Sequence, residues 1–398
     1  MTNQLTYLLQ AGLVIDGTGA APIRNAAVLI SEGKIQFIGP SNQIPPINSE
    51  IITINAPELI AMPGLIDGNN SCSGALKNIK ALNGYFEYGV TTMMGTSLPH
   101  QEAPVQELRD AIEDDVLPGC ARLVAGNMVT CTNGRYPGFK VDGPWEIRRA
   151  VREMTQSGAD FIMTASTGAF GGPGDGEGVH FLCYTQEELN ALVDESHSWN
   201  MPVAVHAMTQ PGLNRAIEAN ADIILHGCFM DNDAIDKMAQ KGIWYLPTLI
   251  ITSPRTIENL KKYPGMYAKK QAAVEVHRAG VRQAIRAGVK LCLGGHGMGF
   301  QPHWNYGEAT AFELAELVRC GMTPLQAITT GTLETAKAFR ADDRIGSLEV
   351  GKEADIVCFS NNPLNDIEML QQPEHVAMVF KKGKIEYTNE KYASHFKD

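Results

Sequence analysis

The chain has 398 residues, of which 44% are apolar, and a formal net charge of −11. This length accommodates one large domain and a smaller one, and the acidic balance disfavours a surface for nucleic acid or anionic membranes. The eight cysteines are scattered without CxxC pairs, which is typical of reduced thiols in a cytoplasmic protein. We expect a small-molecule substrate, no nucleic-acid or membrane partner, and assembly as a homo-oligomer.

Short strand-like segments occupy both ends of the chain. Residues 1–58 contain short apolar runs separated by Gly-containing turns, and the same pattern occurs in Ile345–Phe359 and Val376–Tyr387. Such runs between turn residues are typical of short strands. We therefore predict a small composite β-sandwich domain built from residues 1–58 and 345–398.

Strand-like and helix-like segments alternate through the middle of the chain, residues 59–344. Helical spacing buries one face of Trp145–Ser157, and Thr185–Glu188 forms a capping box that opens a helix ending near Trp199. Alternation of this kind implies parallel strands with right-handed crossovers. The number of strands predicts an α/β fold, a (β/α)8 TIM barrel. The eight predicted strands are Leu59–Asp67, Thr91–Met94, Arg122–Val129, Phe161–Thr164, Val203–His206, Ile223–His226, Trp244–Thr248 and Leu291–Gly294.

The first predicted barrel strand ends in Pro63-Gly-Leu-Ile-Asp67-Gly-Asn69-Asn-Ser71. The apolar run closes on Pro-Gly, reopens, and then breaks into small polar residues. A buried parallel strand that delivers side chains to the mouth of a barrel has this pattern. Asp67, Asn69 and Ser71 are therefore candidate site residues.

Three histidines follow other predicted strands: His206, His226 and His296. In a TIM barrel the active site lies at the C-terminal ends of the strands. A single histidine there is more often an ordinary packed residue, but three at corresponding strand ends predict one site.

The run Pro63–Ser71 resembles the Pro-Gly-Leu-Ile-Asp-x-His-x-His signature of the amidohydrolase superfamily. The segments Val141–Ile162, Tyr184–Leu189 and Thr330–Lys337 resemble its imidazolonepropionase and prolidase-like branch. The resemblance implies a TIM-barrel hydrolase with a small composite β-domain and metal ligands at the strand ends.

Carried over position by position, the resemblance keeps only part of that metal site. His206 and His226 match the ligands on strands five and six. Four of the six positions are changed: the strand-one histidines are Asn69 and Ser71, the bridging lysine after strand four is Met163, and the strand-eight aspartate is His296. A two-metal centre needs a bridging anionic ligand, so at most one metal is expected.

Two mechanisms stay open for the three histidines. As neutral imidazoles they suffice for one Zn²⁺ or similar ion whose bound water hydrolyses a C–N bond. Without a metal they can share general acid and base roles while Asp67 orients the substrate, which suits an isomerase, lyase or hydratase. A catalytically inactive binding or partner subunit is the third interpretation.

Further residues are candidates for binding a small polar or anionic substrate, including cyclic C–N compounds. A guanidinium binds carboxylate well, and a glycine-rich loop after strand four can cover the mouth. The substrate-binding candidates are Asn69, Ser71, Arg135, Tyr136, Met163, Glu177 and His180.

Overall fold

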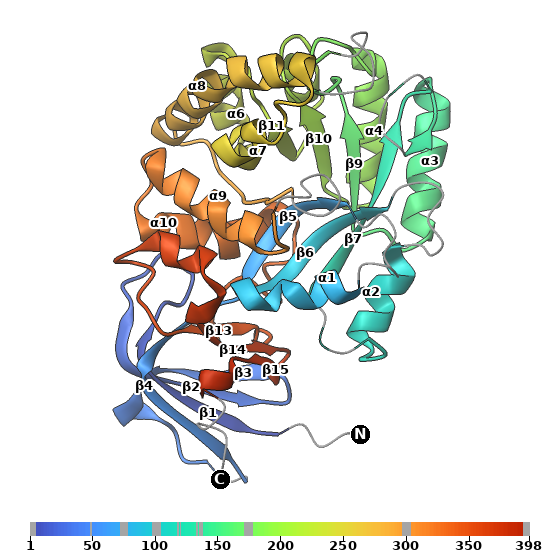
Figure 1. Ribbon diagram of the computed structural model, residues 1–398. Helices are drawn as coiled ribbons and strands as arrows, with labels where there is room; N and C mark the ends of the chain where they lie inside the picture. Colours follow the sequence, from blue (N-terminus) through green and yellow to red (C-terminus); the bar gives the residue numbers. More distant parts are fainter. Residues whose placement is uncertain are drawn as a thin grey trace.

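The computed structural model of the chain describes residues 5–47, 50–71, 79–97, 105–117, 119, 121–132, 134, 138–170, 178–296 and 304–392. Figure 1 shows two parts: a barrel of strands surrounded by helices, and a second sheet below it.

Seven parallel strands make up most of the barrel, in the order β12-β11-β10-β9-β7-β6-β5. They are β5 (Leu65–Ser71), β6 (Val90–Ser97), β7 (Arg122–Thr130), β9 (Phe161–Ala165), β10 (Val203–Ala207), β11 (Ile223–His226) and β12 (Trp244–Leu246). The two-residue strand β8 (Phe139–Lys140) pairs with β7 outside this order. The eighth barrel segment is irregular, with a parallel bridge from Leu291 to Tyr245 and a 2.8 Å hydrogen bond from Gly68 N to Leu293 O. The predicted TIM barrel is confirmed.

Leu59–Asp67 and Trp244–Thr248 are among the predicted strands whose bounds the structure corrects. Leu59–Asp67 is divided at Gly64, since β4 (Ile52–Pro63) belongs to the other sheet and β5 starts at Leu65. A Cβ on Gly64 would lie 2.1 Å from Thr91 Oγ1, so the crossing between the sheets requires a glycine. Likewise β12 ends at Leu246, because Thr248 has a φ of 51° that no strand can contain.

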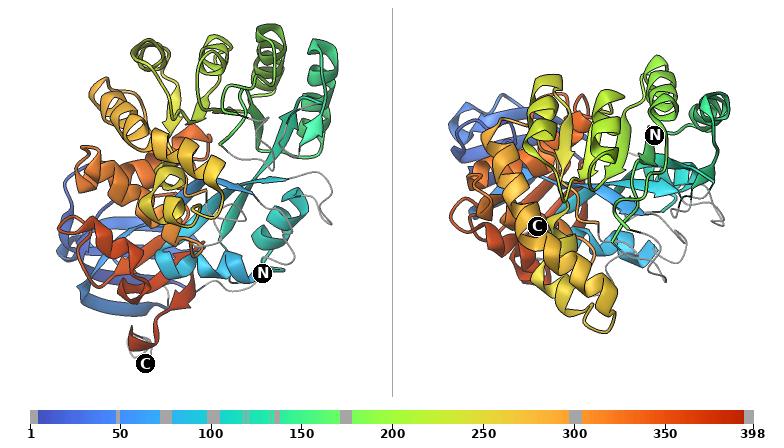
Figure 2. Two further views of the ribbon diagram at one scale, coloured as in Figure 1. Left: turned by 45° about the horizontal axis from the view of Figure 1, so that its top comes forward. Right: turned by 90° about the horizontal axis from the view of Figure 1, so that it is seen from above.

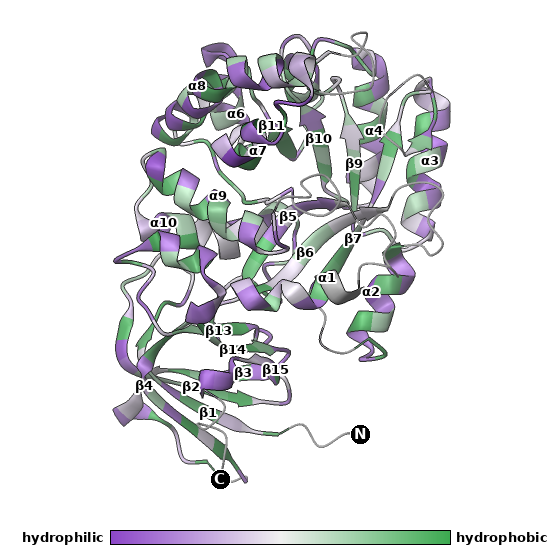
Figure 3. Ribbon diagram, in the orientation of Figure 1, coloured by the Kyte–Doolittle hydropathy of each residue, from purple (hydrophilic) through white to green (hydrophobic). Residues whose placement is uncertain are grey.

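Helices cover the outside of the barrel (Figure 2). In α3 (Pro144–Gln156), Ile147, Val151 and Met154 are buried as predicted. The predicted capping box also forms at the start of α4 (Gln186–Ser198), and Figure 3 shows the polar and apolar sides of these outer helices. The other helices are α1 (Ile79–Gly84), α2 (Val105–Glu113), α5 (Gly212–Glu218), α6 (Asn232–Lys241), α7 (Pro254–Glu258), α8 (Pro264–Arg286), α9 (Glu308–Arg319), α10 (Pro324–Thr329) and α11 (Thr335–Ala338).

None of the helices in the described ranges combines the length and the apolar character that crossing a bilayer requires.

Both ends of the chain contribute to the second sheet, as predicted. Its strands run in the order β15-β14-β13-β4-β1-β2-β3. The sheet curls around its own apolar core. As a result the ring centroids of Tyr7 on β1 and Phe380 on β14 lie 5.7 Å apart, although two other strands lie between β1 and β14 in the sheet. The division into domains at residues 58 and 345 stays a prediction. Besides β4, the strands are β1 (Tyr7–Val14), β2 (Ile23–Ser31), β3 (Lys34–Pro40), β13 (Ile356–Phe359), β14 (Val376–Lys381) and β15 (Lys384–Thr388).

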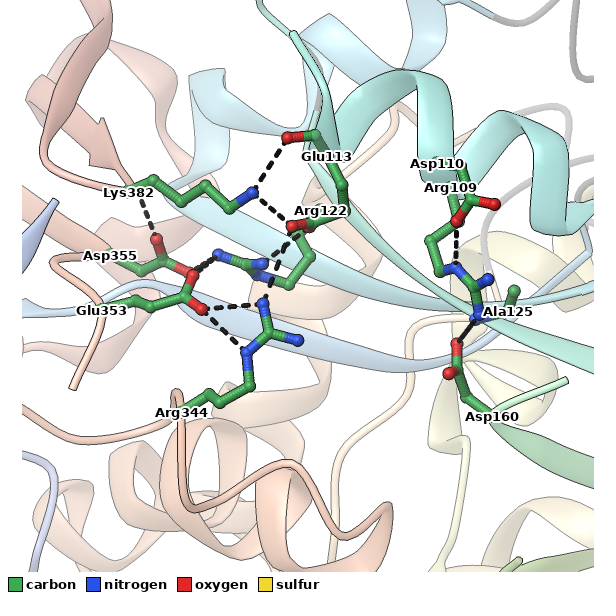
Figure 4. Close-up of polar contacts among 10 residues, drawn as sticks. All are labelled: Arg109, Asp110, Glu113, Arg122, Ala125, Asp160, Arg344, Glu353, Asp355 and Lys382. Carbon is green, nitrogen blue, oxygen red and sulfur yellow. Dashed lines mark hydrogen bonds and ion pairs between the residues drawn. The ribbon is translucent and has the colours of Figure 1, made fainter. Parts of the chain in front are cut away.

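A buried ion-pair network joins the barrel to the C-terminal part of the second sheet (Figure 4). Its centre is Arg122, the first residue of β7, whose side chain is 3% exposed. Arg122 donates to Glu113 at 2.7 Å, to Asp355 at 3.2 Å, and to Glu353. These carboxylates raise the pKa of Arg122 despite its burial. The network lies at the N-terminal ends of the barrel strands, the face that serves stability in this fold.

Candidate active site

The structure brings the three predicted histidines together at the mouth of the barrel. The ring of His226 lies between the other two, 4.5 Å from that of His206 and 5.4 Å from that of His296. His226 and His296 have φ values of 73° and 50°. Left-handed backbone is costly for residues other than glycine and is concentrated at functional sites. The strained strand ends therefore support a shared role for these histidines.

Hydrogen bonds fix His226 on several sides. Its Nδ1 lies 2.5 Å from Thr248 Oγ1, and Thr248 in turn donates to Pro247 O at 2.6 Å. Because the hydroxyl has only one proton to donate, His226 Nδ1 carries the proton and Nε2 keeps its lone pair. The carbonyl oxygen of His226 accepts from His277 Nε2 at 2.9 Å and from the Tyr245 hydroxyl at 2.8 Å.

His206 has the opposite tautomer. Its Nε2 lies 3.2 Å from Gly168 O, and a carbonyl only accepts, so Nε2 carries the proton. In the neutral ring Nδ1 is then the acceptor. The site thus contains two buried imidazoles with defined and different tautomers.

Asp67 acts here as a positioning group. Its side chain is completely buried, and its carboxylate accepts from Gly295 N at 2.7 Å, Thr310 Oγ1 at 2.8 Å and Asn69 N at 3.2 Å. Burial raises the pKa of Asp67, although these hydrogen bonds oppose the shift. The carboxylate joins β5 to the segment that holds His296 and to α9. The catalytic role predicted for Asp67 stays a prediction.

The other predicted residues of the first and fourth barrel strands differ in character. Asn69 is 6% exposed, and its Nδ2 has no hydrogen-bond partner among the described residues. Met163 is partly buried and packs against the apolar cluster that contains Phe161 and Leu225. Ser71 ends β5, and its side chain lies outside the described part of the chain. Asn69 therefore offers an unused donor at the mouth, whereas Met163 continues the core.

Of the remaining substrate-binding candidates, His180 is the one whose position the structure describes. His180 lies in an exposed turn. Arg135, Tyr136 and Glu177 lie outside the described residues. Their predicted roles stay predictions.

Two buried residues of α8 were missed by the sequence analysis: His277 and Lys270. His277 is fully buried and Lys270 is 9% exposed. The sequence does contain a sign of their burial. Lys270 and His277 lie at helical spacing with Ala273, Gly280 and Val281, so all five residues share one face of the helix. Polar residues in a buried stripe could have identified this helix as part of the site.

The residues present do not match the donor set of a metallohydrolase centre. Within the described ranges, no three His, Cys, Asp or Glu side chains are grouped so that they could hold a metal ion. The nearby carboxylates already accept hydrogen bonds from the backbone. Asp67 accepts from Gly295 N, and buried Glu313 accepts from the N–H groups of Leu249 and Ile250 at 2.9 and 2.5 Å.

Burial keeps His226, His277 and His296 neutral at neutral pH. It lowers the pKa of His277 to about 4 and that of His296 to about 3, and it also lowers the pKa of His226. Lys270 further lowers the pKa of His296 and His226 by its positive charge.

The His277→Gln substitution is expected to reduce acid sensitivity. In the unfolded chain His277 takes up a proton near pH 6.5, whereas in the folded protein it does so only near pH 4. The free energy of unfolding therefore falls as pH falls through this window, by up to about 3 kcal/mol for this residue. Urea unfolding at pH 7 and pH 4.5 should show a smaller difference for His277→Gln than for wild type, with partly exposed His375→Gln as control. Equal differences would contradict the assignment.

Comparison with known proteins agrees with this architecture. Residues 83–385 match the amidohydrolase family. Ochratoxinase from Aspergillus niger is 30% identical, over 95% of this chain and 86% of its own. Imidazolonepropionase from Brucella anthropi is 24% identical, over 89% of this chain and 93% of its own. A solved Xaa-Pro dipeptidase with bound methionine superposes with a TM-score of 0.83 and 28% identity, over 96% of this chain and all of that one. The chain belongs to the amidohydrolase family, as its motifs predict.

Proposed function

We propose that this protein hydrolyses an amide-type C–N bond of a small substrate bound over His206, His226 and His296. The observation that carries the proposal is the contact of three imidazoles at the strand ends, with ring separations of 4.5 and 5.4 Å. The relatives support it, because ochratoxinase is 30% identical and an Xaa-Pro dipeptidase shares the fold at 28% identity.

The chain's own residues suit the charge changes of such a reaction. The lone pair at His226 Nε2 can accept a proton from an attacking water. The unused Nδ2 donor of Asn69 can stabilise the negative charge that develops on the carbonyl oxygen. Asp67 holds the backbone of Gly295 and so the position of His296.

Members of this family usually bind a divalent metal. Binding of one Zn²⁺ or similar ion would require His206, His226 and His296 to shift, because as they lie no three His, Cys, Asp or Glu side chains of the described ranges could hold a metal ion. Such an ion would supply an activated water. We propose one metal per chain at most, because the strand-one and strand-four positions offer an amide at Asn69 and a thioether at Met163 in place of ligands.

The second candidate is a metal-independent isomerase, lyase or hydratase that uses the same histidines for acid–base chemistry. It is favoured by the engagement of Asp67 and Glu313 with backbone N–H groups, since neither carboxylate is then available as a metal ligand. A third, an inactive binding subunit, would keep the pocket without turnover.

The test is a substrate screen on protein purified without added metal and analysed for metal content. We expect C–N cleavage of at least one N-acyl amino acid, dipeptide, lactam or hydantoin, and no more than one transition metal per chain. If activity depends on that ion, a chelator should abolish it. Two metals per chain would overturn the single-metal proposal. Turnover of unsaturated acids without C–N cleavage would favour the second candidate, and ligand binding without any turnover the third.

A further inference from the structure

A single 3-10 turn, Leu249–Thr252, follows β12 and is buried next to His226. The residue before the turn is Thr248, whose backbone is left-handed with a φ of 51°. A threonine in this position usually accepts a hydrogen bond from an N–H group at the start of the turn. Within this fully described turn Thr248 makes no such bond, because its hydroxyl group contacts His226 Nδ1 at 2.5 Å and donates to Pro247 O at 2.6 Å. The hydroxyl group that would cap the turn is therefore occupied by the central histidine.

Glu313, in the middle of α9, caps the turn in place of Thr248. Its two carboxyl oxygens accept from Leu249 N at 2.9 Å and from Ile250 N at 2.5 Å. Neither N–H group has an acceptor inside the turn, whose first backbone hydrogen bond starts at Ile251 N. Because the start of the turn is fully buried, these N–H groups would otherwise be left without a partner, at a cost in stability. A side chain from another helix thus does the work of the missing threonine cap.

The far end of the turn is anchored independently of Glu313. Arg278 of α8 donates to Thr252 O at 3.3 Å. Its guanidinium also donates to Glu316 of α9 at 2.5 Å. The hydroxyl group of Thr252 lies 3.1 Å from His277 Nδ1. Loss of Glu313 should therefore free the start of the turn while its end stays in place.

Without Glu313, the start of the turn and the central histidine would compete for one hydroxyl group. Ser and Thr side chains readily accept from nearby backbone N–H groups, and Thr248 is the residue placed to cap Ile250 N. A hydroxyl group turned toward Ile250 no longer accepts from His226 Nδ1. The proton of His226 is then free to occupy Nε2 instead, the nitrogen that has to be unprotonated to take a proton from water.

We propose that Glu313 is a positioning residue for catalysis. By capping the turn, it keeps the hydroxyl group of Thr248 on His226 Nδ1 and so keeps the lone pair of His226 at Nε2. This inference rests on the proposed hydrolysis only for the use of that lone pair in turnover. The control of the tautomer is a property of the folded chain.

Glu313→Gln tests the proposal without turnover. Burial raises the pKa of Glu313 to about 8, and in both protonation states the carboxyl group has an acceptor oxygen for each N–H group. Glutamine keeps the size of the side chain but turns an NH₂ group toward one of them. In protein labelled with ¹⁵N-histidine, wild-type His226 should show a protonated Nδ1 and an unprotonated Nε2, with His226→Asn assigning the signals. In Glu313→Gln the two tautomers should become comparably populated.

A wild-type tautomer in folded Glu313→Gln would overturn the proposal. If that variant does not fold, Glu313→Asp carries the same test, since its carboxyl group is set back from the turn by one methylene group. Glu195→Gln is the control, because Glu195 is an equally buried carboxylate that pairs with Arg148 and Arg152 instead. It should leave the tautomer of His226 unchanged, and a shift there would also count against a specific role of Glu313.

A double-mutant cycle tests the same link through turnover. Glu313→Gln should lower kcat by about 10- to 100-fold with little change in KM. Adding Glu313→Gln to Thr248→Val should cause no further loss, because both changes act through the same hydroxyl group. Losses that multiply would show that Glu313 acts by another route and would overturn the proposal. A tautomer shift in Glu313→Gln, with no C–N cleavage by any form of the protein, would leave Glu313 assigned and sink the hydrolase proposal alone.

Discussion

Replacing His226 by asparagine is expected to lower kcat/KM by about a thousand-fold or more. The ring of His226 lies between the other two. Because Nδ1 donates its proton to Thr248, Nε2 stays unprotonated and keeps its lone pair. The asparagine side chain can still accept or donate a hydrogen bond, but it does not take up or release a proton near neutral pH. The loss should appear mainly in kcat, because proton transfer is needed in the transition state.

Graded variants separate this role from a structural one. Thr248→Val should lower kcat by about 10- to 100-fold while leaving the fold intact, since it removes the acceptor that fixes the tautomer of His226. His375→Asn, which alters a histidine in the second sheet region, should keep wild-type kinetics. A His226→Asn enzyme with more than a tenth of wild-type kcat would remove this ring from the mechanism.

The barrel was predictable because its strands are apolar runs with helices of clear spacing between them. The predicted runs Val203–His206 and Ile223–His226 form β10 and β11, which pair in parallel with His206 opposite Leu225. The division at Gly64 was not predictable from apolarity, because β4 and β5 are both buried and read as one run. The Pro63-Gly64 pair interrupts the run in the sequence, but the assignment of its two halves to different sheets, with Thr91 packed too close to Gly64 for a Cβ, depends on tertiary packing.

The site was predictable only where its residues follow strands. The three histidines do, and the structure groups them. His277 reaches the carbonyl oxygen of His226 from the middle of α8, with Lys270 two turns earlier on the same buried stripe, and distance from a strand end in the sequence does not reveal such a contact. For Asp67, the sequence placed the residue at the mouth but not its partners, since Gly295 and Thr310 lie more than 200 residues away. Long-range hydrogen bonds decide whether such a carboxylate is free for chemistry.

Replacing Arg122 by methionine is expected to lower the free energy of unfolding by about 3–5 kcal/mol. The guanidinium is 3% exposed and is shared by Glu113, Glu353 and Asp355. Removing it leaves Asp355, which is 5% exposed, without an ion-pair partner among the described residues, whereas Glu113 and Glu353 keep pairs with Lys382 and Arg344. Methionine fills a similar volume, so the loss reports the missing charge rather than a cavity.

Urea unfolding at pH 7 measures this loss, and Arg149→Met provides the control. Arg149 also pairs with two carboxylates, Glu146 and Glu153, but it is 50% exposed. Its replacement should cost no more than about 0.5 kcal/mol. Because Arg122 lies at the N-terminal ends of the strands, Arg122→Met should keep wild-type kcat at temperatures where it is folded. A loss below about 1 kcal/mol would mean that Lys382 and Arg344, which also contact Glu113, neutralise the cluster without Arg122.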